Sequence, residues 1–139
     1  MKKKNKFIGI NFGGHDTSAS LLIDDKIVAA CEQERFDLQK HSRSFPIDAI
    51  NECLKIGNIS IGDVDEISFG SDVYDLIREV YLKPALKDEN RLKFLIKDIE
   101  KIKKFINIEN NLRECTGFKG KVNFFRHHLC HLASTYYPS

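Results

Sequence analysis

The order of strand-like and helix-like segments constrains the fold of this chain more than any other feature of its sequence. Five short apolar runs have the length expected of strands and lie at residues 7–12, 18–23, 27–31, 64–69 and 121–125. The first run is continuous and ends at Gly13 and Gly14, which is typical of a buried strand. Only three polar residues separate the second and third runs, so we expect a β-hairpin there, although the turn lacks the usual glycine.

Helical periodicity fills the segments between the third, fourth and fifth runs. Pro46 is expected to open a helix that Gly57 ends. The apolar face of this helix carries Ile47, Ile50, Leu54 and Ile56. Residues 72–117 change to a long amphipathic pattern, in which Pro84 is expected to separate a short helix at 74–82 from a longer one. The apolar positions of the longer helix are Leu92, Leu95, Ile96, Ile99, Ile102 and Ile106.

This order predicts an α/β layer fold with a mixed sheet whose first three strands form a β-meander. Ribonuclease-H-like and actin-like lobes share the order, and so do other α/β folds, so the order indicates the class and not the family. The 139 residues are enough for one domain with a core. We expect a single domain over residues 1–139, with residues 72–117 as a helical insertion.

Composition and charge exclude several classes of function. The formal net charge of +2 gives little reason to expect nucleic-acid binding, and acidic residues interleave with the lysines near residues 93–104, which favours a solvated helix face. The four cysteines form no Cys-x-x-Cys pair and no disulfide pattern, so a cytoplasmic protein with reduced thiols is expected. The apolar runs are too short for an export signal or a membrane span.

The turn after the first strand carries residues with possible chemistry. Gly13 and Gly14 let the backbone approach a ligand, and the following amides and hydroxyls suit phosphate oxygens. His15 could act as a general base or donate to a developing charge, and Asp16 could hold a cation or orient His15. A glycine-rich turn with a capping Asp-Thr-Ser is an equally good interpretation. Lys40 could neutralise an anionic substrate, although charge at a strand end usually marks a solvated edge.

Three histidines close to the end of the sequence predict part of a metal site. If their segment is helical, His127 and His131 project from one face with Cβ atoms about 5–6 Å apart, and their imidazoles could share one metal ion. His128 points elsewhere, but it could pair with His131 instead, and Cys130 could add a soft ligand. Surface or capping histidines are the alternative. A metal ion needs further ligands, so the pair is expected to be an incomplete site.

Taken together, these segments resemble the O-carbamoyltransferases of nodulation-factor and antibiotic biosynthesis. The matching motifs are Ile8-Gly-Ile-Asn11, Gly14-His-Asp16, Ser18-Ala-Ser-Leu-Leu22, Lys26-Ile-Val-Ala-Ala30, Glu34-Arg-Phe36, Lys40-His41, Phe45-Pro46, Ala49-Ile50, Cys53-Leu54, Asp63-Val-Asp65, His127-His-Leu129, His131, Ala133-Ser134 and Tyr137-Pro-Ser139. They occur in order from one end of the chain to the other, whereas residues 74–120 match weakly.

The resemblance implies a lobe of the kind found in the threonylcarbamoyl-adenosine-forming tRNA modification enzymes and the hydrogenase-maturation carbamoyltransferases, which belongs to the actin-like ATPase superfamily. Such enzymes convert carbamoyl phosphate and ATP to a carbamoyl-adenylate and pass the carbamoyl group to a hydroxyl. In this comparison His127 and His131 would bind a divalent metal, iron or zinc. His15 would lie beside the carbamoyl group, Lys40 near carbamoyl phosphate, and Gly13, Gly14 and Asp16 in the same pocket.

Members of that family run to several hundred residues, so the lobe in this chain is expected to be incomplete. We expect an amino-terminal segment that is inactive alone and works with the remainder of a carbamoyltransferase. The alternative is a non-catalytic metal- or partner-binding module that associates with a second copy through an unfinished sheet edge. Nucleic acid is the least favoured partner, and no membrane association is expected.

Overall fold

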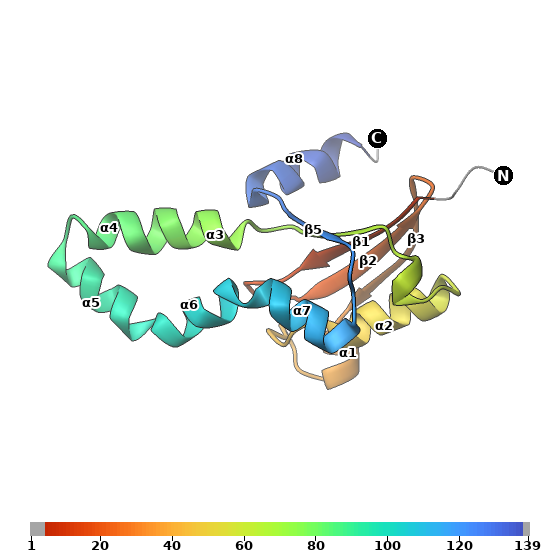
Figure 1. The fold of residues 1–139 in the computed structure, drawn as a ribbon, viewed down its shortest axis with the longest axis horizontal. Coiled ribbons are helices and arrows are strands. Elements are labelled where there is room, and N and C mark those ends of the chain that lie inside the picture. The colour runs from red at the N-terminus through yellow and green to blue at the C-terminus, as the bar shows by residue number, and fades with distance from the viewer. Residues whose placement is uncertain (1–4, 138–139) are drawn as a thin grey trace.

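The computed structural model describes residues 5–137, which build a mixed α/β fold around one five-stranded sheet (Figure 1). The predicted fold class is therefore confirmed at this level. Pro138 and Ser139, which end the last motif of the family resemblance, lie outside the described residues.

The sheet has the order β3-β2-β1-β4-β5. Strands β1 (Lys6–Asn11), β2 (Ser18–Ile23) and β3 (Lys26–Glu32) form the predicted antiparallel meander. Strand β4 (Glu66–Phe69) pairs in parallel with β1, and β5 (Lys121–Phe124) pairs in parallel with β4. All five predicted strands are present, with ends within about two residues of the expected ones.

The turn between β2 and β3 shows how a hairpin forms without glycine. Asp24 and Asp25 adopt φ values of 49° and 63°, the left-handed region that a two-residue hairpin turn requires. Aspartate tolerates this region better than most residues because its short polar side chain can bond locally. The Asp24 carboxylate accepts a hydrogen bond of 3.1 Å from the backbone N–H of Asn5.

Helix α2 (Ile47–Ile56) covers one face of the sheet and packs against β2 and β3. The predicted stop at Gly57 is confirmed. Gly57 itself has φ −72°, and Asn58 after it takes the positive φ. A Cβ at Gly57 would lie 2.4 Å from Cδ2 of buried Leu21. Glycine is needed there because the helix end touches the core. Two short elements flank α2, namely α1 (Glu34–Asp37) and the 3₁₀ turn η1 (Ile61–Asp63).

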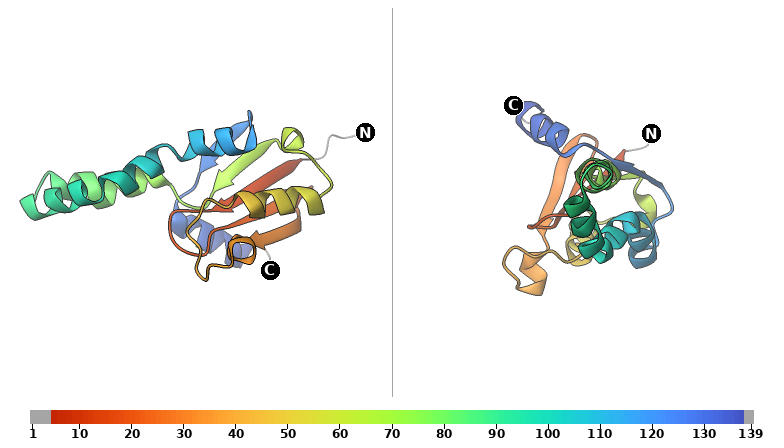
Figure 2. Two further views of the ribbon diagram at one scale, coloured as in Figure 1. Left: turned by 90° about the horizontal axis from the view of Figure 1, so that it is seen from below. Right: turned by 90° about the vertical axis from the view of Figure 1, so that its left-hand side faces the viewer.

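Between β4 and β5 the chain forms a helical arm that projects away from the sheet and returns (Figures 1 and 2). Its elements are α3 (Val73–Leu76), the π-helix η2 (Ile77–Leu82), α4 (Lys83–Ala85), α5 (Glu89–Lys97) and α6 (Ile99–Ile106), followed by α7 (Ile108–Thr116) beside the sheet. Most of residues 72–117 is therefore helical, as the periodicity predicted.

Two details of the predicted arm are wrong. The first helical run continues through Pro84 to Ala85, so the predicted separation from the next helix falls at residues 86–88, just after the proline. The longer helix is broken at Asp98 and Asn107, whose ψ values near 10° end one helix and start the next. Of its predicted apolar face, Ile102 is buried, whereas Leu92, Ile96, Ile99 and Ile106 stay exposed.

Helix α8 (His127–Tyr136) follows β5 directly and lies on the opposite side of the sheet from α2 (Figures 1 and 2). The predicted helix that carries the histidines is therefore present. Among residues 5–137, no helix has both the length and the apolar composition that crossing a membrane requires.

Candidate functional site

A cleft of about 830 Å³ brings together the two segments that the sequence predicts to be functional. The turn after β1 contributes Gly13, Gly14, His15 and Asp16. Helix α8 contributes His127, His128 and His131. The topology explains the meeting, since β1, β4 and β5 run parallel and their carboxyl ends lie at one edge of the sheet, where ligands of open α/β sheets usually bind.

His127 and His131 form the closest histidine pair in the cleft. Their Nε2 atoms lie 2.9 Å apart and their rings meet edge to face. Nδ1 of His127 donates a long hydrogen bond of 3.4 Å to the carbonyl oxygen of Gly70, which leaves its Nε2 lone pair directed at His131. Two nitrogens on one zinc ion would be about 3.3 Å apart given Zn–N bonds of about 2.0–2.1 Å. The pair therefore fits two positions of a metal site after a small ring rotation.

The other predicted candidates of α8 lie differently. His128 also lines the cleft, with its ring centroid 5.9 Å from that of His127. Cys130 lines a separate hollow against the open face of the sheet. Within residues 5–137, no further ligand joins His127 and His131 to make a group of three. The geometry thus favours His127 rather than His128 or Cys130 as the partner of His131.

Acidic side chains from the arm also line the cleft, and each has a structural partner. The Asp72 carboxylate caps α3 by accepting hydrogen bonds from the backbone N–H groups of Tyr74 and Asp75. Nε of Arg126 lies 3.6 Å from Oδ2 of Asp75, so this ion pair ties the start of α8 to the base of the arm.

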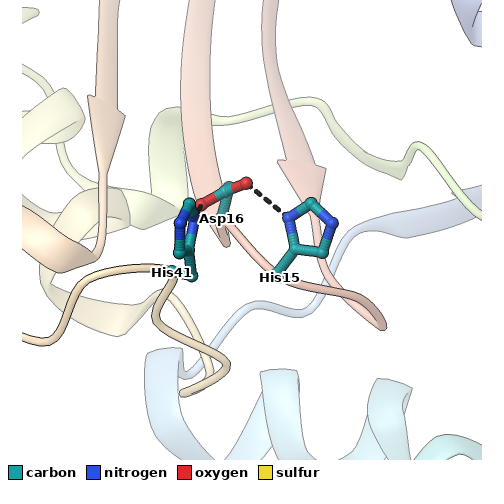
Figure 3. Close-up of side chains that lie close together, drawn as sticks. All are labelled: His15, Asp16 and His41. Atoms are coloured by element: carbon teal, nitrogen blue, oxygen red, sulfur yellow. Dashed lines mark hydrogen bonds and ion pairs between the residues drawn. The ribbon is translucent and has the colours of Figure 1, made fainter.

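A second cluster lies at the turn after β1, where the Asp16 carboxylate binds two histidines (Figure 3). Its Oδ2 accepts a hydrogen bond from Nδ1 of His15, and its Oδ1 accepts one of 2.8 Å from Nδ1 of His41. The ligand atoms of the three residues lie within 4.8 Å of one another, a spacing from which a metal ion could also be held. His41 was missed as a site residue, although its position next to Lys40 in a charged loop was a signal.

The charges in this cluster support one another. The hydrogen bond from His41, followed by that from His15, holds the pKa of Asp16 below its usual value. In return, the hydrogen bond to Asp16 raises the pKa of His41 above its ordinary value near 6.5. Asp16 therefore stays ionised, and His41 carries a proton over a wider pH range than a free histidine.

The remaining predicted residues differ in how closely they approach the cleft. Gly13 has φ 115°, a backbone conformation that only glycine adopts readily, so the turn after β1 depends on it. Lys40 is exposed in the loop between α1 and α2, and it is not among the described residues that line the cleft. The structure thus joins Gly13, Gly14, His15 and Asp16 with the histidine pair, and it leaves Lys40 outside.

The fold is thus an α/β protein with a mixed sheet, and a histidine-lined cleft lies at the carboxyl ends of its parallel strands. Comparison with known families then gives its membership. The family described as "Carbamoyltransferase N-terminus" matches residues 6–139, and the chain belongs to this family. The resemblance noted in the sequence is confirmed.

Three relatives illustrate the relationship. Uncharacterized protein sll1178 of Synechocystis is 31% identical over 143 residues, covering 95% of this chain and 23% of that protein. Nodulation protein NolNO of Sinorhizobium fredii is 36% identical over 55 residues, covering 40% of this chain and 8% of that protein. An uncharacterized 19.2 kDa protein of Rhizobium etli is 33% identical over 66 residues, covering 48% of this chain and 39% of that protein. The chain therefore spans less than half the length of each of these relatives.

Proposed function

We propose that this chain forms the amino-terminal part of an O-carbamoyltransferase, which transfers a carbamoyl group from carbamoyl phosphate to a hydroxyl acceptor through a carbamoyl-adenylate made with ATP. The observation that carries the proposal is the cleft in which His15, bound to Asp16, lies together with the histidine pair of α8. Membership of the carbamoyltransferase family supports the reaction class. A cytoplasmic location belongs to the same proposal, because ATP is a substrate.

The strand order supports a finer assignment of the fold. The order β3-β2-β1-β4-β5, with a meander followed by two parallel strands, is the order shared by ribonuclease-H-like and actin-like ATPase lobes. We assign the chain to an incomplete lobe of the actin-like kind. Its cleft at the carboxyl ends of β1, β4 and β5 is the position at which such a sheet binds ligands.

His15 is proposed as the residue that moves the proton. Its Nδ1 donates to Asp16, which leaves Nε2 to take the proton of the acceptor hydroxyl. As the hydroxyl oxygen bonds to the carbamoyl carbon, the bond from that carbon to the adenylate phosphate oxygen breaks and AMP leaves. Gly13 and Gly14 are proposed to let the backbone approach the donor, and Lys40 to neutralise the charge of carbamoyl phosphate from its adjacent loop.

The histidine pair is proposed to hold a divalent metal ion, iron or zinc. His127 and His131 would supply two nitrogen ligands, and the remainder of a full-length carbamoyltransferase would supply the others. Such an ion would provide Lewis-acid polarisation of the carbamoyl oxygen.

A chimera tests this function. Residues 1–139 replace the matching region of the Synechocystis relative, with the unmodified relative as control. If that control is active, the chimera should transfer labelled carbamoyl from carbamoyl phosphate to hydroxylated acceptors and release pyrophosphate from ATP, and H15A should lower transfer by about 10²–10⁴-fold. A folded chimera without transfer would contradict the proposal. The isolated 139 residues are expected to give no turnover, so activity from them would contradict the proposed dependence on a second part.

A second candidate function is a non-catalytic module that associates with a copy of itself. Edge strand β3 favours it, because Ile27 and Val28 are exposed there beside unpaired backbone groups. Light scattering over a range of concentrations should then detect a dimer that a charged substitution such as I27K abolishes. A monomer at high concentration would argue against this candidate.

A further inference from the structure

The Asp16 carboxylate is shared by two histidines from separate segments (Figure 3). His15 is its neighbour in the turn after β1, whereas His41 comes from the loop between α1 and α2, 25 residues further along. The two rings lie edge to face with centroids 5.9 Å apart. Each carboxylate oxygen thus has its own imidazole partner.

The hydrogen bonds determine which ring nitrogen carries the proton. An ionised carboxylate only accepts hydrogen bonds, so each histidine must have its hydrogen on Nδ1, and in the neutral form the lone pair is on Nε2. Within residues 5–137 the Nε2 of His15 has no hydrogen-bond partner that would oppose this tautomer. A carboxylate held at one oxygen can rotate about its own axis, whereas one held at both oxygens cannot. His41 therefore fixes the group that orients His15.

The loops beneath the cluster are joined by buried groups. The backbone N–H of Thr17 donates to the carbonyl oxygen of Ser42 at 3.2 Å. The Thr17 hydroxyl donates to the carbonyl oxygen of Ser44 at 2.8 Å. Thr17 and Ser42 are both almost fully buried. Asp16 and His41 have φ values of 59° and 58°, a left-handed conformation that most non-glycine residues avoid. The cluster is therefore built into two cross-linked loops.

The charged groups around His41 come from the turn after β1 and from helix α1. Asp16 faces it from the turn after β1. Glu34 of α1 accepts a hydrogen bond of 2.9 Å from the backbone N–H of His41, and the guanidinium of Arg35 lies 4.0 Å from the Glu34 carboxylate. The carboxylate of Asp37 in α1 accepts a hydrogen bond from the hydroxyl of Ser42. The negative charges of Asp16 and Glu34 both favour the protonated ring of His41, which donates its hydrogen bond to Asp16.

We propose that His41 is a positioning residue, which by holding the second oxygen of Asp16 keeps His15 with Nδ1 toward the carboxylate and Nε2 available for proton transfer. The effect of His41 on catalysis rests on the function proposed for His15. The fixed tautomer of His15 does not depend on that function and can be measured on the isolated chain.

Nitrogen-15 NMR of the labelled, EDTA-treated chain at pH 8.5, above the usual range of histidine titration, tests the tautomer directly. In the wild-type chain Nε2 of His15 should show the shift of an unprotonated ring nitrogen. H41A should give a mixture of tautomers, H41N should restore the wild-type signal because its amide can donate to the same oxygen, and H128A should change nothing at His15. An unchanged His15 signal in a folded H41A chain would overturn the proposal.

Two further readouts separate the alternatives. If added zinc shifts His15 and His41 before it shifts His127 and His131, the cluster is a metal site and the proposal fails. In an active chimera, H41A should lower kcat about 10-fold with little change in KM, and H41N should recover most of the loss. Equal losses from H41A and H41N would contradict the hydrogen-bonding role. An inactive chimera with a fixed tautomer would instead count against the proposed function alone.

Discussion

Two regions organise their residues in opposite ways: the loops at the carboxyl end of β1, which line the cleft, and the helical arm. Where β1 ends, side chains bond to distant segments: the Thr17 hydroxyl donates to the carbonyl oxygen of Ser44, and the Asp16 carboxylate accepts from His41. In the arm most ion pairs are local, such as Glu79 with Lys83 four residues later, and the pair of Asp75 with Arg126 joins only the base of the arm to α8. Several large apolar side chains of the arm remain exposed. The difference teaches that helical periodicity determines the local structure of the arm, whereas pairing in the sheet determines the geometry of the cleft.

The largest expected effect contrasts a core position with an arm position. Leu21 is fully buried, so L21A should cost about 2–5 kcal/mol of unfolding free energy through lost burial and a cavity. Ile96 of the arm is 60% exposed, so I96A should change the same quantity by less than about 0.5 kcal/mol. Urea denaturation of both variants measures the contrast. Similar losses would show that Ile96 is packed as firmly as Leu21, which contradicts its exposure.

A smaller effect is expected where helix α2 ends on the core. G57A should cost about 1–3 kcal/mol, because the new Cβ would overlap Leu21. G14A is the matched control, since a Cβ there meets nothing within 4 Å. Thermal unfolding compares the two variants. A G57A protein as stable as the wild type would mean that the helix end can shift, and the packing account would be wrong there.

The arm should respond locally to the loss of a helix cap. Asp88 accepts a hydrogen bond of 2.8 Å from the backbone N–H of Asn90 at the start of α5. D88A should weaken this helix by about 1 kcal/mol, which lowers hydrogen-exchange protection in α5 about fivefold and leaves β1 unaffected. Equal loss of protection in β1 would show that arm and sheet unfold together.

The smallest effect is a pH dependence at the sheet edge. Because the folded-state pKa of His41 is raised by Asp16, this pair contributes stability that is complete below about pH 6.5 and is lost as the pH rises through the raised value. D16N should therefore cost more stability at pH 6 than at pH 9. D63N removes a carboxylate whose pKa is lowered by Ser60, so its cost should be the same at both pH values. An equal cost of D16N at both pH values would contradict the His41 interaction.

The strands and the histidine pair could be predicted from the sequence, because they depend on local patterns. The contacts between loops and the breaks within the arm could not. Apolar runs and their order predicted the strands, because alternation and burial are local properties. The i,i+4 spacing predicted that His127 and His131 face one another. The partnership of Asp16 with His41 was not predicted, because it depends on how two loops meet through Thr17 and Ser42. The breaks at Asp98 and Asn107 also went unpredicted, since a continuous apolar pattern contains no signal for them.

The central claim is that the turn after β1 and helix α8 form one cleft, and a paramagnetic ion tests it most directly. Cobalt added to the nitrogen-15-labelled chain should bind the histidine pair and broaden the signals of His127 and His131 first. The signals of His15 and Asp16 should broaden with them. Those of Asp24 and Asp25, in the hairpin turn near the amino end of β1, should stay sharp. H131A should abolish the effect. Broadening at His131 that spares His15 as fully as Asp25 would contradict the account.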